Sequence, residues 1–149
     1  MCMNVSVIGA GTMGNGIAHV FAMHGHKVTL VDVSEQALER ALSTIDRNLD
    51  RMLSKGSITE ADKAAALSGI QTSTSIANGV ASADLVVEAA TERVELKLEI
   101  FKTLDQHAPA HAVLASNTSS ISITRIASVT NRPKQVIGMH FMNPVLVMK

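Results

Sequence analysis

Residues 5–14 read VSVIGAGTMG, a short apolar run that passes directly into the glycines Gly9, Gly11 and Gly14. Val and Ile favour a β-strand, whereas residues 13–23 are typical of a helix. Glycine suits a strand-to-helix connection that needs a tight turn, a close approach of the backbone to a ligand, and close packing of helix on strand. The free amides and positive dipole of the helix start attract phosphate groups. The stretch therefore predicts a phosphate-binding loop after the first strand of a parallel sheet.

An acidic residue follows at the expected distance. Asp32 ends the second predicted strand 18 positions after Gly14, close to the interval of about 20 residues at which a carboxylate accepts hydrogen bonds from the adenosine ribose. A carboxylate there repels a 2′-phosphate, and the neighbouring Val33 and Ser34 supply no arginine to bind one. The pair of features predicts NAD rather than NADP. The alternative interpretation is an aspartate that only caps the turn after its strand.

The rest of the chain alternates short runs rich in Val and Ile with longer stretches of helical periodicity. This pattern predicts the α/β class, with a doubly wound (Rossmann), mostly parallel sheet of about six strands and helices on both faces. No linker or repeat divides the chain, so residues 1–149 are expected to form a single domain. Strands are predicted over residues 4–9, 27–33, 70–73, 84–89, 112–116 and 135–141, and helices over residues 13–23, 35–54 with Ser34 as N-cap, from Thr59 to Gly69, 94–106, and from near Ser120.

The composition argues against two classes of partner. Lys and Arg together number 13, as do Asp and Glu, so the formal net charge is zero and bulk charge favours neither nucleic acid nor an anionic membrane. Aromatic residues are 2% of the chain, with no Trp or Tyr, which removes the stacking platforms of a single-strand nucleic-acid binder. We expect no nucleic-acid partner and no membrane partner.

The single cysteine and the histidines predict no disulfide and no metal. Cys2 has no partner in the chain, and the residues around it form neither a basic signal-peptide start nor a spanning helix, so a cytoplasmic location is expected. His24 and His26 flank a glycine that ends a helix, while Pro109 interrupts any helical pairing of the remaining candidates, His107 with His111.

Three later motifs narrow the prediction. They are DLVVEAATE at residues 84–92, SNTSS at residues 116–120 and HFMNPV at residues 140–145. Together with GAGTMGNGIA at residues 9–18, they resemble the N-terminal domain of the L-3-hydroxyacyl-CoA dehydrogenase family, which includes the bacterial 3-hydroxybutyryl-CoA dehydrogenases. The resemblance covers essentially the whole chain, and few dinucleotide folds share both of the last two motifs.

The resemblance implies reversible oxidation of (S)-3-hydroxyacyl-CoA to 3-oxoacyl-CoA, with hydride transfer to NAD. His140 matches the family's general base, which takes the proton of the substrate 3-hydroxyl, and an imidazole of ordinary pKa near ~6.5 suits that task. Ser119 matches the serine that contacts this hydroxyl beside the nicotinamide. Judged without the family, the serines of SNTSS are more typical of a helix cap, and His140 of a structural histidine.

The resemblance also implies ligand contacts, including acyl-CoA contacts at Asn48, Lys55 and Ser119. Serine is more familiar than asparagine at the first of these positions. Arg47, Arg51 and Lys55 recur every four residues, so they share one helix face that suits the phosphates of coenzyme A. The alternative is a solvated face paired with Asp46 and Asp50. The implied NAD contacts are Gly9, Gly11, Thr12, Met13, Gly14, Asp32, Glu92, Lys97, Ser119 and Asn143.

Family members continue into a helical domain that forms homo-oligomers, closes the substrate cleft and is absent from these 149 residues, and their motif reaches a glutamate that orients the catalytic histidine. We therefore expect this chain to bind NAD and to turn over substrate poorly or not at all. Leu146 stands where the family usually has proline, and the resulting VLVM run is expected to favour self-association. Two alternatives stay open: a non-catalytic NAD-binding module, which has no need of His140 and Ser119, and a sugar-acid dehydrogenase of the same superfamily.

Overall fold

One parallel sheet forms the centre of the molecule. The computed structural model describes residues 2–118 and 121–139, and these contain six strands. Each strand is three to five residues long, and most strand residues are buried because the sheet is covered on both faces. The strands are β1 Asn4–Ile8, β2 Lys27–Val31, β3 Ile70–Ser73, β4 Leu85–Glu88, β5 Val113–Ser116 and β6 Val136–Gly138.

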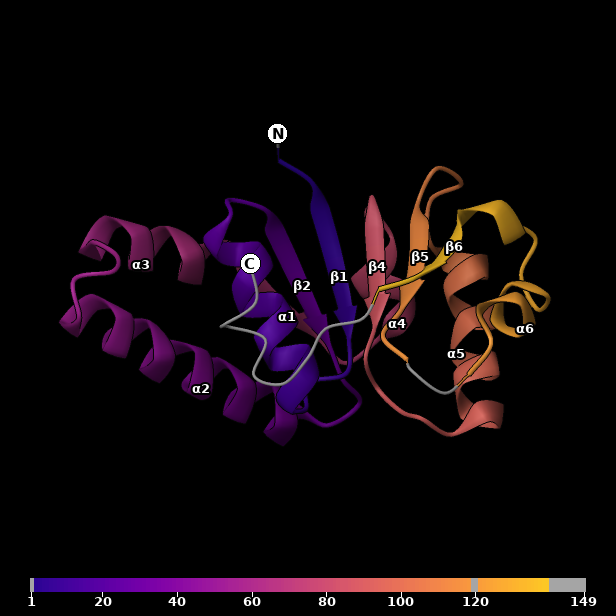
Figure 1. The fold of residues 1–149 in the computed structure, drawn as a ribbon, viewed down its shortest axis with the longest axis horizontal. Coiled ribbons are helices and arrows are strands. Elements are labelled where there is room, and N and C mark those ends of the chain that lie inside the picture. Colours follow the sequence, from indigo (N-terminus) through magenta and orange to yellow (C-terminus); the bar gives the residue numbers. More distant parts are fainter. Residues whose placement is uncertain (1, 119–120, 140–149) are drawn as a thin grey trace.

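The strand order is β3-β2-β1-β4-β5-β6, and every neighbouring pair is parallel. This is the order of a full doubly wound dinucleotide fold, so the predicted fold class is confirmed. The chain winds outward from β1 in one direction and from β4 in the other, and ligands bind in such sheets where the order reverses, at the carboxyl ends of the strands. Figure 1 shows β1 and β4 side by side in the middle of the sheet.

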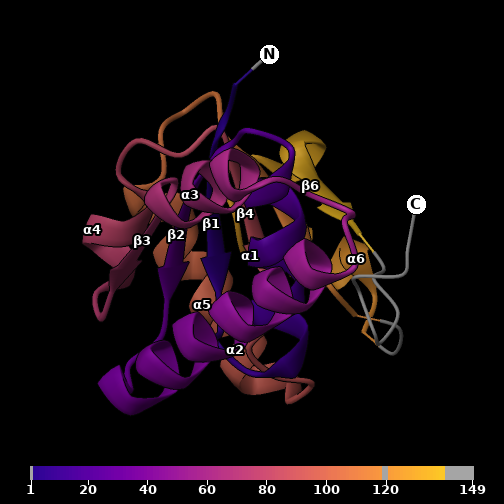
Figure 2. The same cartoon turned by 90° about the vertical axis from the view of Figure 1, so that its left-hand side faces the viewer.

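Helices cover both faces of the sheet (Figures 1 and 2). The first three helices pack on one face and the last three on the other. Right-handed crossovers have this result because the two halves of the sheet are wound in opposite directions from its centre. The helices are α1 Thr12–Met23, α2 Glu35–Ser54, α3 Glu60–Ser68, α4 Ile76–Val80, α5 Val94–His107 and α6 Ile123–Ala127, with a 3-10 turn at Pro133–Gln135.

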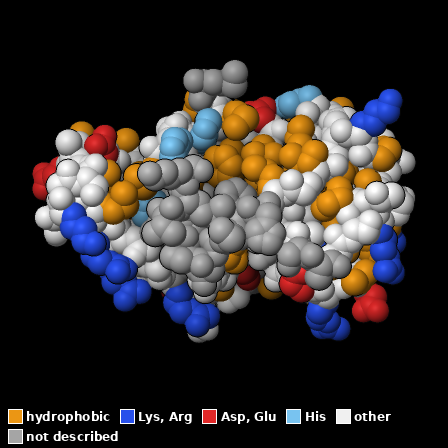
Figure 3. Space-filling view, viewed as in Figure 1, with side chains coloured by type: hydrophobic (Ala, Val, Ile, Leu, Met, Phe, Trp, Pro, Cys, Tyr) orange, Lys and Arg blue, Asp and Glu red, His pale blue; other side chains and the backbone are white. Residues whose placement is uncertain are grey.

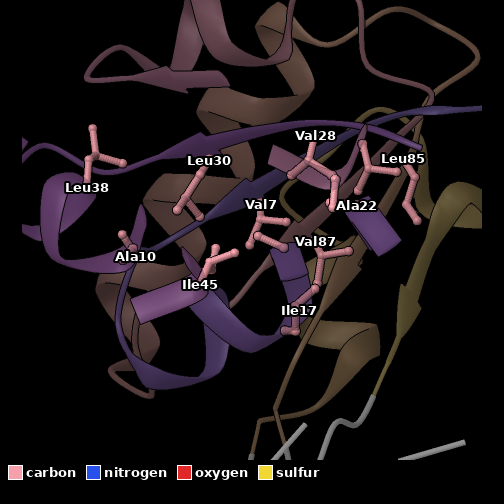
Figure 4. Close-up of a cluster of buried hydrophobic side chains, with 14 of the residues drawn as sticks. Val7, Ala10, Ile17, Ala22, Val28, Leu30, Leu38, Ile45, Leu85 and Val87 are labelled. Atoms are coloured by element: carbon pink, nitrogen blue, oxygen red, sulfur yellow. The ribbon is translucent and has the colours of Figure 1, made fainter. Parts of the chain in front are cut away.

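Alternation along the strands divides the core into two layers. In β1, Val7 faces the layer with α1, α2 and α3, whereas Ile8 faces the layer with α4, α5 and α6. Figure 4 shows the first layer, in which Ile17 of α1 and Ile45 of α2 lie against the sheet. Each fully buried side chain of this size contributes about 1.5–3 kcal/mol, so both layers are needed to hold the sheet.

Several element ends differ from the predicted ones by a residue or two. β1 ends at Ile8 because Gly9 has a positive φ of 105°. β2 ends at Val31 rather than residue 33, since the side chain of Asp32 binds backbone amides and turns the chain. The prediction missed α4, a helix of only five residues that is too short to show a period. β6 occupies Val136–Gly138, while the last two residues of its predicted range lie outside the described residues.

Candidate functional site

The glycine loop lies on the end of β4, at the point where the strand order reverses. The amide of Gly9 donates to the carbonyl of Val31 at 2.7 Å, which ties the loop to β2. A Cβ atom at Gly9 would lie 2.7 Å from Cα of Ala90 and 2.9 Å from the carbonyl oxygen of Ala89. Both the positive φ and this close approach exclude any other residue here. The glycine is therefore needed to seat the loop between the end of β2 and the segment after β4.

The other two glycines have opposite surroundings. A Cβ atom at Gly14 would lie 1.7 Å from the carbonyl oxygen of Gly9, so this glycine lets α1 pack directly against the loop. A Cβ atom at Gly11 would meet nothing within 4 Å. Thr12 is exposed and Met13 is half-buried beside this open position. The backbone at Gly11 is thus open to the close approach of a phosphate, as predicted for a pyrophosphate loop.

The starts of the helices single out the same place. Ser or Thr side chains cap the helices α2, α3, α4 and α6. None of these four helices directly follows one of the two central strands, β1 and β4. No side-chain cap closes α1 or α5, the helices that follow β1 and β4. The first amides of a helix without a cap need another acceptor. At α1, where the N-cap is Gly11, a phosphate oxygen could serve as that acceptor.

Asp32 comes directly after β2, and both of its oxygens bind the backbone. Oδ2 accepts from the amide of Ala10 at 2.9 Å, and Oδ1 accepts from the amide of Ser34 at 2.9 Å. Asp32 thus caps its own turn, as the alternative interpretation has it, and also fixes the glycine loop. The carboxylate is half-buried, and a carboxylate has about four acceptor positions, so it retains acceptors for ribose hydroxyls.

The loops after β4 and β5 lie against each other. The hydroxyl of Thr118 donates to Oε2 of Glu92 at 2.9 Å, and the amide of Asn117 donates to the carbonyl of Glu88 at 2.8 Å. The SNTSS segment and the predicted cofactor residue Glu92 are therefore brought together. The predicted residues Ser119, His140 and Asn143 lie outside the described residues, and their roles stay predictions.

Lys97 of α5, another predicted cofactor residue, lies in the interior. Its side chain is completely buried, and its ammonium pairs with Glu88 and donates to the hydroxyl of Ser116 at 3.2 Å. The sequence analysis missed Glu88 and Ser116. A signal was present, because Lys97 shares the buried stripe of α5 with Phe101 and Leu104. A lysine in such a stripe requires an acidic partner.

Two of the predicted acyl-CoA residues, Asn48 and Lys55, lie in the second half of α2 and at its C-cap. Asn48 accepts a hydrogen bond from Arg51, and the exposed Lys55 is the C-cap of the helix. Figure 3 shows Lys and Arg side chains along this helix, at the lower left. Asp46 and Asp50 pair with Lys63 of α3, whereas Arg47, Arg51 and Lys55 are exposed, so a solvated face stays open as the alternative.

The length of α2 separates these residues from the glycine loop. Asp32 precedes the start of α2, whereas Lys55 caps its other end. A helix of 20 residues is about 30 Å long, so the structure does not bring the two groups together. A ligand that reaches both ends has to be extended. Coenzyme A has this property, and the acyl-CoA contacts stay a prediction.

Some groups elsewhere in the described part of the chain have shifted pKa values. Burial lowers the pKa of His19, whose Nδ1 atom has no hydrogen-bond partner. The amide of Asn4 and the imidazole of His111 lower the pKa of Asp84, and Asp50 and Asp46 raise the pKa of Lys63. The described residues contain no group of three or more His, Cys, Asp or Glu side chains arranged to hold a metal ion.

The strand order, the open glycine loop and the acidic residue after β2 define a dinucleotide-binding domain of the Rossmann class. Over residues 4–149 the chain matches the sequence profile of the family described as "3-hydroxyacyl-CoA dehydrogenase, NAD binding domain". The chain belongs to this family. Its cofactor is therefore NAD, in agreement with the prediction from Asp32.

Relatives and solved structures agree with this assignment. The 3-hydroxybutyryl-CoA dehydrogenase of Bradyrhizobium diazoefficiens is 50% identical over 145 residues, which are 97% of this chain and 49% of that protein. The mitochondrial hydroxyacyl-coenzyme A dehydrogenase of Rattus norvegicus is 48% identical, with 98% and 48% covered. The crystal structure of (S)-3-hydroxybutyryl-CoA dehydrogenase PaaH1 from Ralstonia eutropha has a TM-score of 0.94 at 49% identity, over 98% of this chain and 51% of that one. The chain thus spans about half the length of these proteins.

Proposed function

We propose that this chain is the cofactor-binding part of an enzyme that interconverts (S)-3-hydroxyacyl-CoA and 3-oxoacyl-CoA, with the 149 residues forming one NAD-binding domain. The observation that carries the proposal is the open glycine loop beside Asp32, in a chain whose family profile matches from residue 4 to residue 149. The names of the relatives supply the substrate class, since two of the three name 3-hydroxybutyryl-CoA.

The residues at the carboxyl ends of the strands have separate roles in binding and catalysis. The first amides of α1 bind the pyrophosphate, and Asp32 accepts from the ribose while it fixes the loop. When bound, NAD accepts or returns the hydride of the substrate carbon. His140 takes the proton of the 3-hydroxyl as general base, and Ser119 orients that hydroxyl by a hydrogen bond. Asn143 and Glu92 help to hold the cofactor.

The acyl-CoA partner is placed along α2. Its phosphates meet Lys55 and the exposed Arg47 and Arg51, and Asn48 lies on the same half of the helix. Asp46 and Asp50 are occupied by Lys63, which supports this role because the two aspartates do not neutralise the basic face. We expect slow turnover by these 149 residues alone, because a substrate that is not held in line with the cofactor reacts slowly.

Location and self-association complete the proposal. None of the described helices is both long and apolar enough to cross a bilayer. We place the protein in the cytoplasm, as the bacterial relatives favour, although the rat relative is named as mitochondrial. Figure 3 shows apolar side chains gathered over β4 and β5, and Ile137 of the edge strand β6 is 40% exposed, which supports association through this face.

A turnover assay tests the proposal. NADH oxidation by acetoacetyl-CoA should be slow in this chain and should be abolished by His140→Gln, while NADH binding is retained. His107→Gln is the matched control, because His107 is exposed at the far end of α5. Turnover that persists in the His140 variant would contradict the general base. Faster reduction of NAD with a hydroxy sugar acid than with 3-hydroxybutyryl-CoA would favour the sugar-acid enzyme.

A further inference from the structure

We propose that Glu88, Lys97 and Ser116 form a positioning network that holds the loops after β4 and β5 in the arrangement that binds NAD. The network lies at the carboxyl ends of β4 and β5, inside the layer covered by α5. The proposal rests on the NAD site of the proposed function and is independent of the acyl-CoA substrate.

All three side chains are completely buried, and their polar atoms are paired. Oε1 of Glu88 accepts from the Lys97 ammonium and, at 3.0 Å, from the hydroxyl of Ser116. Lys97 also donates to that hydroxyl at 3.2 Å, so each member contacts the other two. A buried charge persists only when it is paired and its remaining hydrogen-bond positions are satisfied. The arrangement is therefore closed on itself and fixed in one geometry.

Glu88 transmits this geometry to the loop after β4. Its Oε2 atom accepts from the amides of Ala90 at 2.8 Å and Thr91 at 3.3 Å. Ala90 is the residue whose Cα atom lies 2.7 Å from the position of a Cβ at Gly9. The orientation of the buried carboxylate thus sets the backbone against which the phosphate loop is packed.

The same network reaches the loop after β5. Ser116 is the last residue of that strand, and the amide of the next residue, Asn117, donates to the carbonyl of Glu88 at 2.8 Å. Thr118 then binds Glu92 of the loop after β4. One buried cluster therefore fixes both loops that border the cofactor crevice, together with the segment that leads into Ser119.

Stability alone gives no reason for a charged pair at this position. Apolar side chains, Phe101 and Leu104, fill the same stripe of α5 further along. Replacing a buried ion pair by apolar residues of similar size is often neutral or stabilising. What the pair adds is direction, because a carboxylate held by a lysine and a serine presents its second oxygen to two loop amides at fixed positions.

The test compares single and double variants of the ion pair. Lys97→Met and Glu88→Gln each leave a buried group without its partner, so both should lower the melting temperature. The double variant is neutral and close in shape, and it should recover most of that loss. NADH titration followed by cofactor fluorescence should nevertheless show affinity reduced about tenfold or more in the double variant. A double variant that binds NADH as the unmodified chain does would overturn the proposal.

A matched pair of charges at the opposite edge of the sheet provides the control. Asp105 and Arg132 are also nearly buried, so the double variant Asp105→Asn/Arg132→Leu should alter stability but keep NADH affinity within about twofold. Equal loss of affinity there would overturn the proposal, since the effect would then be general loosening. If the ion-pair variants do not fold, Ser116→Ala keeps the pair and should weaken NADH binding severalfold at a temperature where the variant is folded, and unchanged affinity would count against the network. Failure of the unmodified chain to bind NADH would overturn the cofactor site itself.

Discussion

Buried charged side chains have different partners at the two ends of the parallel strands. We call the amino ends of the strands the amino edge and their carboxyl ends the carboxyl edge. At the amino edge, Arg132 pairs with Asp105 and donates to the carbonyls of Pro109 at 2.6 Å and Ala112 at 3.2 Å. These contacts supply hydrogen-bond donors to backbone carbonyls in the segment that follows α5. At the carboxyl edge, Glu88 and Lys97 pair with each other, and Glu88 binds the amides of a loop that borders the ligand crevice.

The difference separates stability from function. The Arg132 cluster binds the protein's own carbonyl groups and leaves nothing for a ligand. The carboxyl edge instead keeps the start of α1 without a side-chain cap and the position of Gly11 open. A substitution at the amino edge should therefore change stability alone. A substitution at the carboxyl edge should change NAD binding, and it should also change stability where it alters packing.

The largest effect is expected from Gly14→Ala, which should reduce both stability and NAD binding. The added methyl group would lie 1.7 Å from the backbone carbonyl of Gly9, and backbone cannot move aside as a flexible side chain does. Helix α1 would have to leave the loop, with a loss of more than about 4 kcal/mol in the free energy of unfolding. Chemical denaturation measures the loss. A variant as stable as the unmodified chain would show that the packing of α1 on the loop is wrong.

Arg132→Leu is the test of the amino edge. The substitution leaves Asp105 and several carbonyl groups without their partner in a nearly buried position, so stability should fall by about 3–5 kcal/mol. NADH affinity, measured at a temperature where the variant is folded, should not change. Reduced affinity in the folded variant would mean that the two edges are coupled.

Asp32→Asn should have a smaller and more specific effect. The amide keeps one acceptor in place of two, so one of the amides of Ala10 and Ser34 loses its partner. The ribose hydroxyls would also donate to a neutral amide in place of a carboxylate. Hydrogen bonds to a charged group contribute about 1.5–3 kcal/mol, so the loss of charge predicts NADH affinity lower by about tenfold or more. The preference for NADH over NADPH should narrow, because the repulsive charge is gone. Parallel titrations with both cofactors decide this, and an unchanged preference would exclude Asp32 as its cause.

The smallest effect concerns pH. Burial lowers the pKa of His19 in the folded state, so below about pH 6.5 the unfolded chain binds more protons than the folded one. Stability should therefore decrease as the pH falls from about 7 through the unfolded pKa and toward the lower folded pKa. His19→Gln should flatten this part of the melting-temperature profile without changing NADH affinity at neutral pH. An equally steep profile in the variant would assign the dependence to other groups.

The sequence was sufficient for the fold and for the glycine turn that follows β1. The apolar alternation located β3 at Ile70–Ser73 and α2 at Glu35–Ser54 with its Ser34 cap, because both signals are local. Gly9, Gly11 and Gly14 were identified because a strand-to-helix turn restricts which residues fit. All of these signals lie in residues that are neighbours in the chain.

The partners of buried charges were less accessible to such reasoning. Lys97 was assigned to the cofactor by resemblance, and its pairing with Glu88 and Ser116 depends on how α5 docks on β4 and β5. Similarly, Lys63 reaches Asp46 and Asp50 from α3, a pairing that the spacing of charges along α2 does not predict. Each of these pairings joins different elements, so it follows from tertiary packing and not from local spacing.

The most direct test of the account is the response of NADH binding to Gly11→Ala. A methyl group at Gly11 meets no protein atom within 4 Å, so the variant should keep its melting temperature within a few degrees, about the effect of losing glycine as an N-cap. NADH titration should show saturable binding by the unmodified chain and affinity lower by about tenfold or more in the variant. Equal NADH affinity in the two proteins, at equal melting temperature, would contradict the assignment of the open loop at Gly11 as the cofactor site.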